Sequence, residues 1–345
     1  MIQFQCDYNE GAHPMILQRL TETNMEQTVG YGEDPYCEQA RELIRKACQN
    51  DNIDVHFLVG GTQTNTTVIA HTLRPYQGVI SAVSGHINVH ETGAIEATGH
   101  KVLAIASADG KLTAAQVEEA VIAHRNEDGP EHMVQPGMVY ISFPTEVGTV
   151  YTLSELKAIS TVCRKYELPL FIDGARLGYG LCSPESDITL PDLAQLADVF
   201  YIGGTKVGAL FGEAVVITSE ALKRDFRYSI KRHGGMLAKG RLLGLQFDTL
   251  FTDNLYMQIA QHAIDEAMRI KAALQEAGIK VLIDSPTNQQ FPIFSNAQLE
   301  ALSKKYRFSF WQQMDAEHAA VRICTSWGTK SENVKSLIED IKQLG

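Results

Sequence analysis

Short apolar runs rich in β-branched and aromatic residues recur along the chain from about residue 53, and segments with helical periodicity, such as 113–126 and 153–166, lie between most of them. Seven of these runs are predicted strands: 53–59, 78–83, 101–106, 138–143, 168–173, 198–203 and 214–218. Strands that alternate with helices form parallel sheets covered on both faces. The pattern therefore predicts an α/β domain with a mostly parallel seven-stranded sheet and helices on both faces.

Two local signals refine this prediction. The connection between 198–203 and 214–218 is too short for a helical crossover, so we expect these two strands to be antiparallel neighbours. Thr152, with Glu155 three residues later, forms a capping-box pattern and predicts where the helix 153–166 begins.

After the glycine-containing stretch 233–244 the pattern changes to a long helix over about 254–278. The following apolar runs are predicted strands (KVLID, QFPIF, FSFWQQM and AAVRICTS), and a closing helix lies near 331–344. This order predicts a smaller α+β domain at the carboxyl end. We divide the chain into an N-terminal arm with a short helix (1–24), a large domain (25–247) and a small C-terminal domain (248–345).

Composition narrows the class of protein. The 345 residues are 44% hydrophobic and carry a formal net charge of −11, which fits a globular protein and argues against nucleic acid or an anionic membrane as the main partner. No apolar run approaches the ~20 residues that span a bilayer. The six cysteines are scattered and the N-terminus lacks signal-peptide features, so we expect a reducing cytoplasm.

Two segments place charged residues at the carboxyl ends of predicted strands, where ligands bind in open α/β sheets. Asp173 begins D-G-A-R (173–176), and its alternative role is an N-cap or a salt bridge with Arg176. Lys206 lies among glycines after the strand 198–203. A partly desolvated lysine there can form a Schiff base, whereas an isolated one is more often a solvated surface residue.

Two further segments are weaker on their own. Gly61 and Thr62 belong to a Gly-Gly-Thr turn between a strand and a helix, where backbone N–H groups make a phosphate cradle; a plain helix start is the alternative. His86 and His90 are four residues apart, but no H-E-x-x-H or cysteine cluster accompanies them, so we predict no metal. We interpret His86 as stacking on a flat aromatic ligand, with an ordinary buried histidine as the alternative.

Together the four segments match the needs of pyridoxal 5'-phosphate. This cofactor requires a phosphate cradle, a ring-stacking residue, a carboxylate at its pyridine nitrogen and a Schiff-base lysine. Arg176 and Arg322 are candidates to hold a substrate carboxylate in charge-assisted pairs. A surface arginine on a strand is the alternative for Arg322.

The chain resembles the threonine aldolase and β-eliminating lyase family of pyridoxal-phosphate enzymes, fold type I. The resemblance runs from FQCDYNEGAHP and YGEDPYCEQA through GGTQTN, GHINVHETGA, DGKLTAAQVEEA, D-G-A-R and T-K-V-G to VRICTSW. It implies that Lys206 carries the Schiff base and that Asp173 pairs with the pyridine nitrogen. It further implies a set of cofactor and substrate contacts: Gly61 and Thr62 on phosphate, His86 on the ring, and Arg176 and Arg322 on the substrate carboxylate.

The chain departs from the family pattern in three places. FPTEVGTVY (143–151) has Glu146, or nothing, where many members have a second active-site histidine. Cys6 stands where a serine often contacts the substrate, and T-K-V-G-A-L-F-G replaces S-K-G-L-G-A-P-V-G. These differences indicate a divergent subgroup.

The resulting hypothesis is a lyase that cleaves a β-hydroxy-α-amino acid, threonine or allo-threonine, to glycine and an aldehyde by retro-aldol cleavage. The base is left open among His86, Lys206, Glu146 and an ordered water. The alternatives are a β-eliminating lyase or an aminotransferase, a non-catalytic cofactor-binding protein, and a metal-dependent hydrolase built on His86 and His90.

The resemblance also implies an oligomer, because sites of this kind lie between subunits. We expect a homodimer or homotetramer with shared active sites, in which YGED (31–34) and Arg232 reach the neighbouring site. The partners expected otherwise are small amino-acid substrates.

Overall fold

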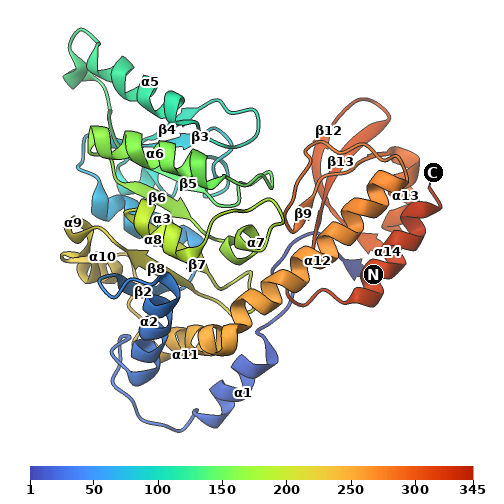
Figure 1. Cartoon of the computed structure of the whole chain (residues 1–345), viewed down its shortest axis with the longest axis horizontal. Coiled ribbons are helices and arrows are strands. Elements are labelled where there is room, and N and C mark those ends of the chain that lie inside the picture. Colours follow the sequence, from blue (N-terminus) through green and yellow to red (C-terminus); the bar gives the residue numbers. More distant parts are fainter. Residues whose placement is uncertain (345) are drawn as a thin grey trace.

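The computed structural model describes residues 1–344, and a seven-stranded sheet forms the centre of its larger part (Figure 1). All seven strands predicted from the sequence are present. In spatial order they are β2 (Asp54–Leu58), β8 (Glu213–Ile217), β7 (Val199–Gly203), β6 (Leu170–Asp173), β5 (Gln135–Ser142), β3 (Gln77–Ala82) and β4 (Val102–Ile105).

The strands β7, β6, β5, β3 and β4 run parallel. β8 is antiparallel to β7, which confirms the prediction from the short connection between them. β2 is also antiparallel to β8 and forms an edge that the sequence pattern did not orient. The parallel strands end at one edge of the sheet, so side chains that follow β5, β6 and β7 meet there.

Helices cover both faces of the sheet. One face packs against α2 (Pro35–Cys48), α5 (Ala114–Arg125), α6 (Leu153–Tyr166), α7 (Leu177–Leu181), α8 (Leu190–Leu196) and α11 (Arg241–Phe251). The other packs against α3 (Gly61–Thr72), α4 (His86–Val89), α9 (Glu220–Lys223) and α10 (Phe226–Arg232). The capping box of Thr152 and Glu155 begins α6, as predicted.

Alternation along the buried strands decides which residues face the helix α3. Leu170 and Ile172 of β6 join the core on the α6 side, whereas Phe171 joins the core on the α3 side. Because side chains alternate with period two, Asp173 points to the same face as Phe171. Tyr140 of β5 and Tyr201 of β7 also belong to the α3-side core, so two phenols converge on Asp173.

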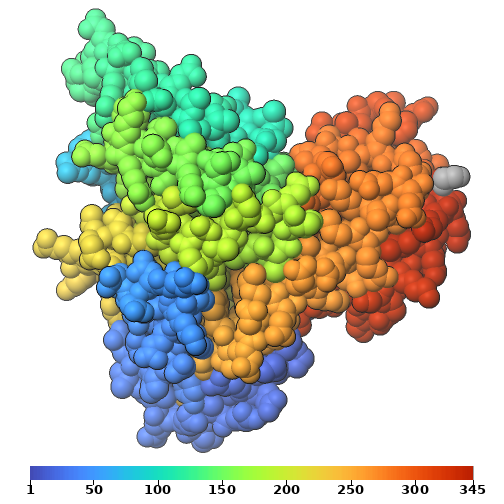
Figure 2. Space-filling model, in the orientation of Figure 1, coloured from blue at the N-terminus to red at the C-terminus, as the bar shows by residue number. Residues whose placement is uncertain are grey.

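The smaller part of the molecule is built on a second sheet and a long helix. α12 (Leu255–Glu276) runs from the large sheet domain to this part, which forms a separate lobe in the space-filling view (Figures 1 and 2). β13 (His318–Cys324) pairs with β10 (Ile293–Ser295), β12 (Ser309–Gln313) and β9 (Gln289–Gln290). The helices α13 (Asn296–Ser303) and α14 (Ser331–Lys342) complete the lobe.

The N-terminal segment reaches across the molecule. β1 (Ile2–Gln3) pairs in parallel with β11 (Tyr306–Arg307) of the smaller lobe, and the chain then returns to α1 (Pro14–Glu22) beside α11. Residues between β1 and α1 therefore pass between the two lobes. The remaining elements are three short 3-10 helices, η1 (Glu96–Thr98), η2 (Pro130–His132) and η3 (Thr252–Asn254).

One predicted strand was wrong, and several helices were missed, α13 among them. KVLID (280–284) forms only an isolated bridge between Val281 and Pro292. The helices α2 and α11 were not predicted from the pattern. The proposed domain boundaries stay a prediction, and the second of them falls inside α11. No helix within residues 1–344 is long and apolar enough to span a membrane.

Candidate active site

A cavity of about 300 Å³ lies at the carboxyl ends of β5, β6 and β7. Six of the site residues predicted from the sequence line it: Gly61, Thr62, His86, Asp173, Arg176 and Lys206. Polar side chains that the sequence did not assign to the site line it as well, among them Tyr8, Ser142, Tyr201, Thr205 and Glu213. The topology thus gathers residues from distant segments at the edge where open α/β sheets bind ligands.

Asp173 is held by four hydrogen-bond donors. The hydroxyls of Tyr140 and Tyr201 each donate at 2.5 Å, one to Oδ2 and one to Oδ1. Asn65 Nδ2 donates to Oδ2 at 3.1 Å and the Ala175 N–H to Oδ1 at 3.0 Å. Burial alone would raise the pKa of Asp173, but His86 and the two phenols hold it below its ordinary value. The carboxylate is therefore ionised and fixed.

His86 is oriented by a buried carboxylate. Its Nδ1 lies 2.8 Å from Oε1 of Glu91, whose side chain is fully buried, and Asn65 Nδ2 donates to the same oxygen at 2.8 Å. Asn65 thus links the carboxyls of Glu91 and Asp173. Because a carboxylate oxygen accepts, Nδ1 is the donor in this pair.

The first turn of α3 leaves backbone donors for a ligand. Gly60, at the N-cap, is extended and makes no side-chain capping bond, so the N–H groups of Gly61 and Thr62 have no acceptor within the helix. A helix N-terminus of this kind binds anions. A Cβ on Gly61 would lie 3.1 Å from the hydroxyl of Tyr201, so a glycine keeps this approach open.

Lys206 follows β7 and lies in the cavity. Burial and the nearby Arg176 lower its pKa, while Asp7, Asp173 and Glu213 act in the opposite direction. The result is an amine that loses its proton more readily than a surface lysine, as a Schiff-base nucleophile requires. Its backbone carbonyl accepts a hydrogen bond of 2.5 Å from Tyr179, which fixes the loop.

Glu213, the first residue of β8, is a buried carboxyl beside Lys206. Its Oε1 accepts from Thr205 Oγ1 at 2.8 Å and its Oε2 from the Gly204 N–H at 3.1 Å. The two oxygens of Glu213 thus connect β8 to the loop that carries Lys206. Burial raises the pKa of the Glu213 carboxyl to about 8.

Arg176 makes a two-pronged ion pair within the protein. Its Nε lies 2.6 Å from Oδ2 of Asp7 and its Nη2 lies 3.0 Å from Oδ1, and Asn288 Nδ2 also donates to Oδ2 at 2.9 Å. Although burial acts in the opposite direction, Arg176, Lys206 and Asn288 lower the pKa of Asp7 to about 2. The sequence offered Arg176 as a contact for the substrate carboxylate, with a salt bridge to Asp173 as the alternative. The observed salt bridge is with Asp7 rather than Asp173, and the substrate role stays a prediction.

Two predicted substrate contacts lie outside the residues that line the cavity. Arg322 donates from Nη1 to Gln289 Oε1 at 3.2 Å and from Nη2 to the carbonyl of Gln5 at 3.1 Å. Its buried Nε has no hydrogen-bond partner within residues 1–344. The Cys6 thiol donates to Asn9 Oδ1 at 3.0 Å. Their substrate roles stay predictions.

Tyr8, Ser142, Tyr201 and Glu213 were missed by sequence reasoning. Tyr201 carried a usable signal, because it shares the alternating face of β7 that reaches Asp173. Tyr8 carried none, since only the path of the N-terminal segment between the lobes brings it to the cavity. Within residues 1–344 no group of three or more metal-ligating side chains occurs, and the rings of His86 and His90 are 5.6 Å apart.

Comparison with known proteins places these residues in context. The structure superimposes on that of a threonine aldolase from Leishmania major with a TM-score of 0.97 and 44% identity, covering 100% of this chain and 99% of that one. A low-specificity L-threonine aldolase of Pseudomonas aeruginosa is 31% identical over 99% of this chain and 97% of its own length. A histidinol-phosphate aminotransferase from Clostridium acetobutylicum shares the fold at a TM-score of 0.76 and 11% identity.

These likenesses confirm the fold class predicted from the sequence, the fold type I architecture with a mostly parallel sheet and a smaller C-terminal lobe. A family model described as β-eliminating lyase matches residues 4–297, which include the segments that line the cavity. The chain therefore belongs to the β-eliminating lyase family.

Proposed function

We propose that this protein is a pyridoxal-phosphate-dependent aldehyde-lyase that cleaves threonine or allo-threonine to glycine and acetaldehyde. The observation that carries the proposal is the meeting of Lys206, Asp173 and the open start of α3 in one cavity. The names of the relatives from Leishmania major and Pseudomonas aeruginosa, both threonine aldolases, support the choice of reaction.

The residues present fit the cofactor. The N–H groups of Gly61 and Thr62 suit the phosphate, and the ionised Asp173 suits a protonated pyridine nitrogen. Asp173 already accepts hydrogen bonds from Tyr140, Tyr201, Asn65 and Ala175, so its orientation is set before any ligand arrives. When bound, the cofactor supplies an electron sink for the electrons of the bond that breaks at Cα.

The chain's own residues then orient the substrate. His86, held by Glu91, presents a flat imidazole to the cavity, and Arg176, held by Asp7, keeps a positive charge at its wall. Arg322 approaches from the smaller lobe on β13, next to the N-terminal segment. We assign the substrate carboxylate to this side, with Cys6 and Tyr8 as neighbours, because the two arginines supply charge-assisted donors.

The decisive variant is Lys206→Ala. We expect it to abolish aldehyde release and the yellow absorbance of the protein-bound cofactor, because no other lysine lines the cavity within the described residues. The measurement is aldehyde and glycine production from the four stereoisomers of threonine and allo-threonine, together with the visible spectrum. Lys157→Ala, at an exposed position of α6, is the matched control.

Three outcomes would overturn this proposal. A fully active Lys206→Ala protein would show that the reaction needs no Schiff base on Lys206. Pyruvate with ammonia from the unaltered protein would indicate β-elimination instead, and a keto acid formed only with an amino acceptor would indicate transamination.

We also propose a homodimer or homotetramer with shared active sites, in a reducing cytoplasm. Tyr31 of the YGED segment is 48% exposed although it is a large hydrophobic residue, and Arg232 is exposed at the end of α10. All six cysteines are free thiols. Sedimentation equilibrium of the purified protein tests the assembly, and a monomer with full activity would contradict it.

A further inference from the structure

Glu146 is a half-buried carboxyl with hydrogen-bond donors on one of its two oxygens. It lies in the loop between β5 and α6 and lines the cavity. Its Oε1 accepts two hydrogen bonds, from Ser142 Oγ at 2.5 Å and from the backbone N–H of His86 at 2.8 Å. Its Oε2 accepts no side-chain or backbone hydrogen bond from another of the described residues 1–344. The carboxyl is thus anchored by one oxygen and presents the other to the cavity.

The other two carboxyls of the cavity differ in this respect. Both oxygens of Asp173 accept two donors each. Each oxygen of Glu213 accepts one donor, from Thr205 or from Gly204. Among the carboxyls that line the cavity in the described part of the chain, Glu146 is the one with an oxygen that accepts no hydrogen bond from another residue.

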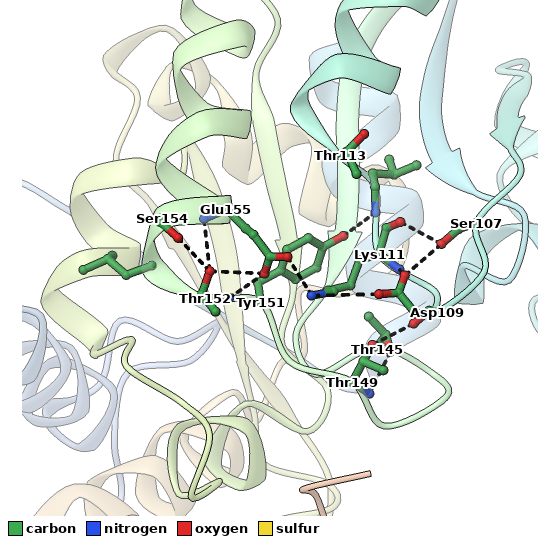
Figure 3. Close-up of polar contacts among 12 residues, drawn as sticks. Ser107, Asp109, Lys111, Thr113, Thr145, Thr149, Tyr151, Thr152, Ser154 and Glu155 are labelled. Atoms are coloured by element: carbon green, nitrogen blue, oxygen red, sulfur yellow. Dashed lines mark hydrogen bonds and ion pairs between the residues drawn. The ribbon is translucent and has the colours of Figure 1, made fainter. Parts of the chain in front are cut away.

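The loop that carries Glu146 is clamped on its large-domain side (Figure 3). Thr145 and Thr149 close it with a hydroxyl contact of 2.6 Å, and Thr149 Oγ1 donates to the carbonyl of Asp109 at 2.7 Å. The Tyr151 hydroxyl accepts from the Leu112 N–H at 2.7 Å. These contacts join the loop to the segment before α5, so Glu146 is held on a fixed support.

The smaller lobe clamps the same loop from the other side. Ser285 Oγ donates to the carbonyl of Gly148 at 2.9 Å. Gly148 has a φ of +79°, and a Cβ there would lie 2.3 Å from Ser285 Oγ. Only glycine fits this conformation and this approach. The position of Glu146 therefore depends on both lobes.

The surroundings of Glu146 shift the pKa of its carboxyl upward. Burial raises its pKa and the carboxylate of Asp173 adds to the rise, while the hydrogen bonds from Ser142 and the His86 N–H oppose it. The other titratable groups nearby are Tyr140 on β5, Tyr151 at the end of the loop and the imidazole of His86 on α4. A carboxyl whose titration is moved toward neutral pH works as a base in one direction and an acid in the other.

We infer that Glu146 is a catalytic residue that takes the proton of the substrate β-hydroxyl through Oε2. This inference rests on the proposed function. The O–H bond of the substrate breaks and its proton joins Glu146, while the C–O bond becomes the carbonyl of the aldehyde. The electron pair of the Cα–Cβ bond is left on the glycine fragment, which takes one proton from water at Cα. Glu146 then returns its proton to water.

The central experiment is Glu146→Gln in the cofactor-loaded enzyme. The amide keeps an oxygen for Ser142 and the His86 N–H but cannot accept the proton, so we expect kcat for aldehyde release to fall by about 10²–10⁴-fold. Solvent exchange of the α-proton of glycine involves no hydroxyl, so it should continue at near the unaltered rate. Glu119→Gln, at an exposed position of α5, is the matched control for both measurements.

Ser142→Ala gives a second, independent signature. It removes a donor that lowers the pKa of Glu146, so the acidic limb of the kcat profile should move to higher pH. The same shift should appear without cofactor or turnover, in a carboxyl ¹³C NMR titration of the apo protein. The resonance is assigned by its loss in Glu146→Gln.

The outcomes separate this inference from the proposed function. An unaltered protein that neither releases aldehyde nor exchanges the α-proton of glycine would remove both. An unaltered protein that does both, with Glu146→Gln releasing aldehyde at the same rate, would overturn the role of Glu146 alone. If Glu146→Gln does not fold, an acidic limb that stays in place in Ser142→Ala would overturn it equally.

Discussion

Two carboxyls near the ends of neighbouring strands, Asp173 and Glu146, have pKa values that are shifted in opposite directions. Asp173 ends β6, and Glu146 follows β5 by four residues; Ser142, opposite Asp173 in the ladder, is the donor to Glu146. Both carboxyls line the cavity, Asp173 buried and Glu146 half-buried. Yet the pKa of Asp173 is lowered and that of Glu146 is raised.

The difference follows from how the donors are distributed. Asp173 has four donors spread over two oxygens, and these outweigh the desolvation that burial imposes. Glu146 has two donors on one oxygen and the charge of Asp173 nearby, so desolvation prevails. One strand end thus holds a fixed charge, and the next holds a carboxyl that titrates above its ordinary range, which is the kind of division that acid–base sites use.

The largest expected effect comes from removing the fixed charge. Asp173→Asn replaces an acceptor-only group by an amide whose NH₂ faces donors, and it removes the charge expected at the pyridine nitrogen. We expect kcat for aldehyde release to fall by about 10²–10³-fold, in line with the loss of one preorganised electrostatic contact. Steady-state kinetics at saturating cofactor give the comparison.

Asp128→Asn, on an exposed loop, is the control for the loss of one negative charge away from the cavity. If Asp173→Asn kept more than a tenth of the kcat, the fixed charge would not be needed, and the contrast between the two strand ends would lose its functional meaning.

A smaller effect comes from removing one donor. Tyr140→Phe leaves Oδ2 of Asp173 with Asn65 alone, so we expect a loss of about 1.5–3 kcal/mol in the free energy of unfolding at neutral pH. Because the folded-state pKa of Asp173 is lowered, its contribution is present above its ordinary pKa and disappears as the pH falls through the folded value. The deficit should therefore shrink in acid, as urea unfolding of the apo protein at several pH values would reveal.

Tyr151→Phe is the matched control for Tyr140→Phe. Its hydroxyl accepts from the backbone of Leu112 rather than donating to a carboxylate, so its loss should cost only about 0.5–1.5 kcal/mol. Equal losses in the two variants at neutral pH would indicate that the charge of Asp173 is not what the phenols stabilise.

The contrast also marks how far the sequence could be used for prediction. Strand ends at 173 and 203 follow from apolar runs and turn residues, so Asp173 and Lys206 were found with the sheet itself. The partner of Arg176 could not be predicted, because Asp7 reaches it only through the pairing of β1 with β11 across the molecule. Local pattern carries strand position, whereas ion pairs between distant segments depend on the tertiary path.

Glu146 lies between these cases. The sequence placed it near the site, but as one of four candidates for the base. What distinguishes it is the count of donors on each oxygen, and those donors come from β5 and α4, 4 and 60 residues away in the chain. Such a count depends on side-chain geometry that no periodicity encodes.

The smallest expected effect is on the pH dependence of stability in Glu146→Gln. Its folded pKa is raised above 4.5, so the protonated form contributes stability that is complete below that value and is lost as the pH rises through the folded pKa. A glutamine side chain does not titrate, so the free energy of unfolding of Glu146→Gln minus that of the unaltered apo protein should increase with pH over this window. The increase should exceed the ~0.5 kcal/mol typical of surface substitutions such as Glu119→Gln. A flat difference would mean that Glu146 titrates in the folded protein as it does in the unfolded chain, and the two strand ends would then hold the same kind of charge.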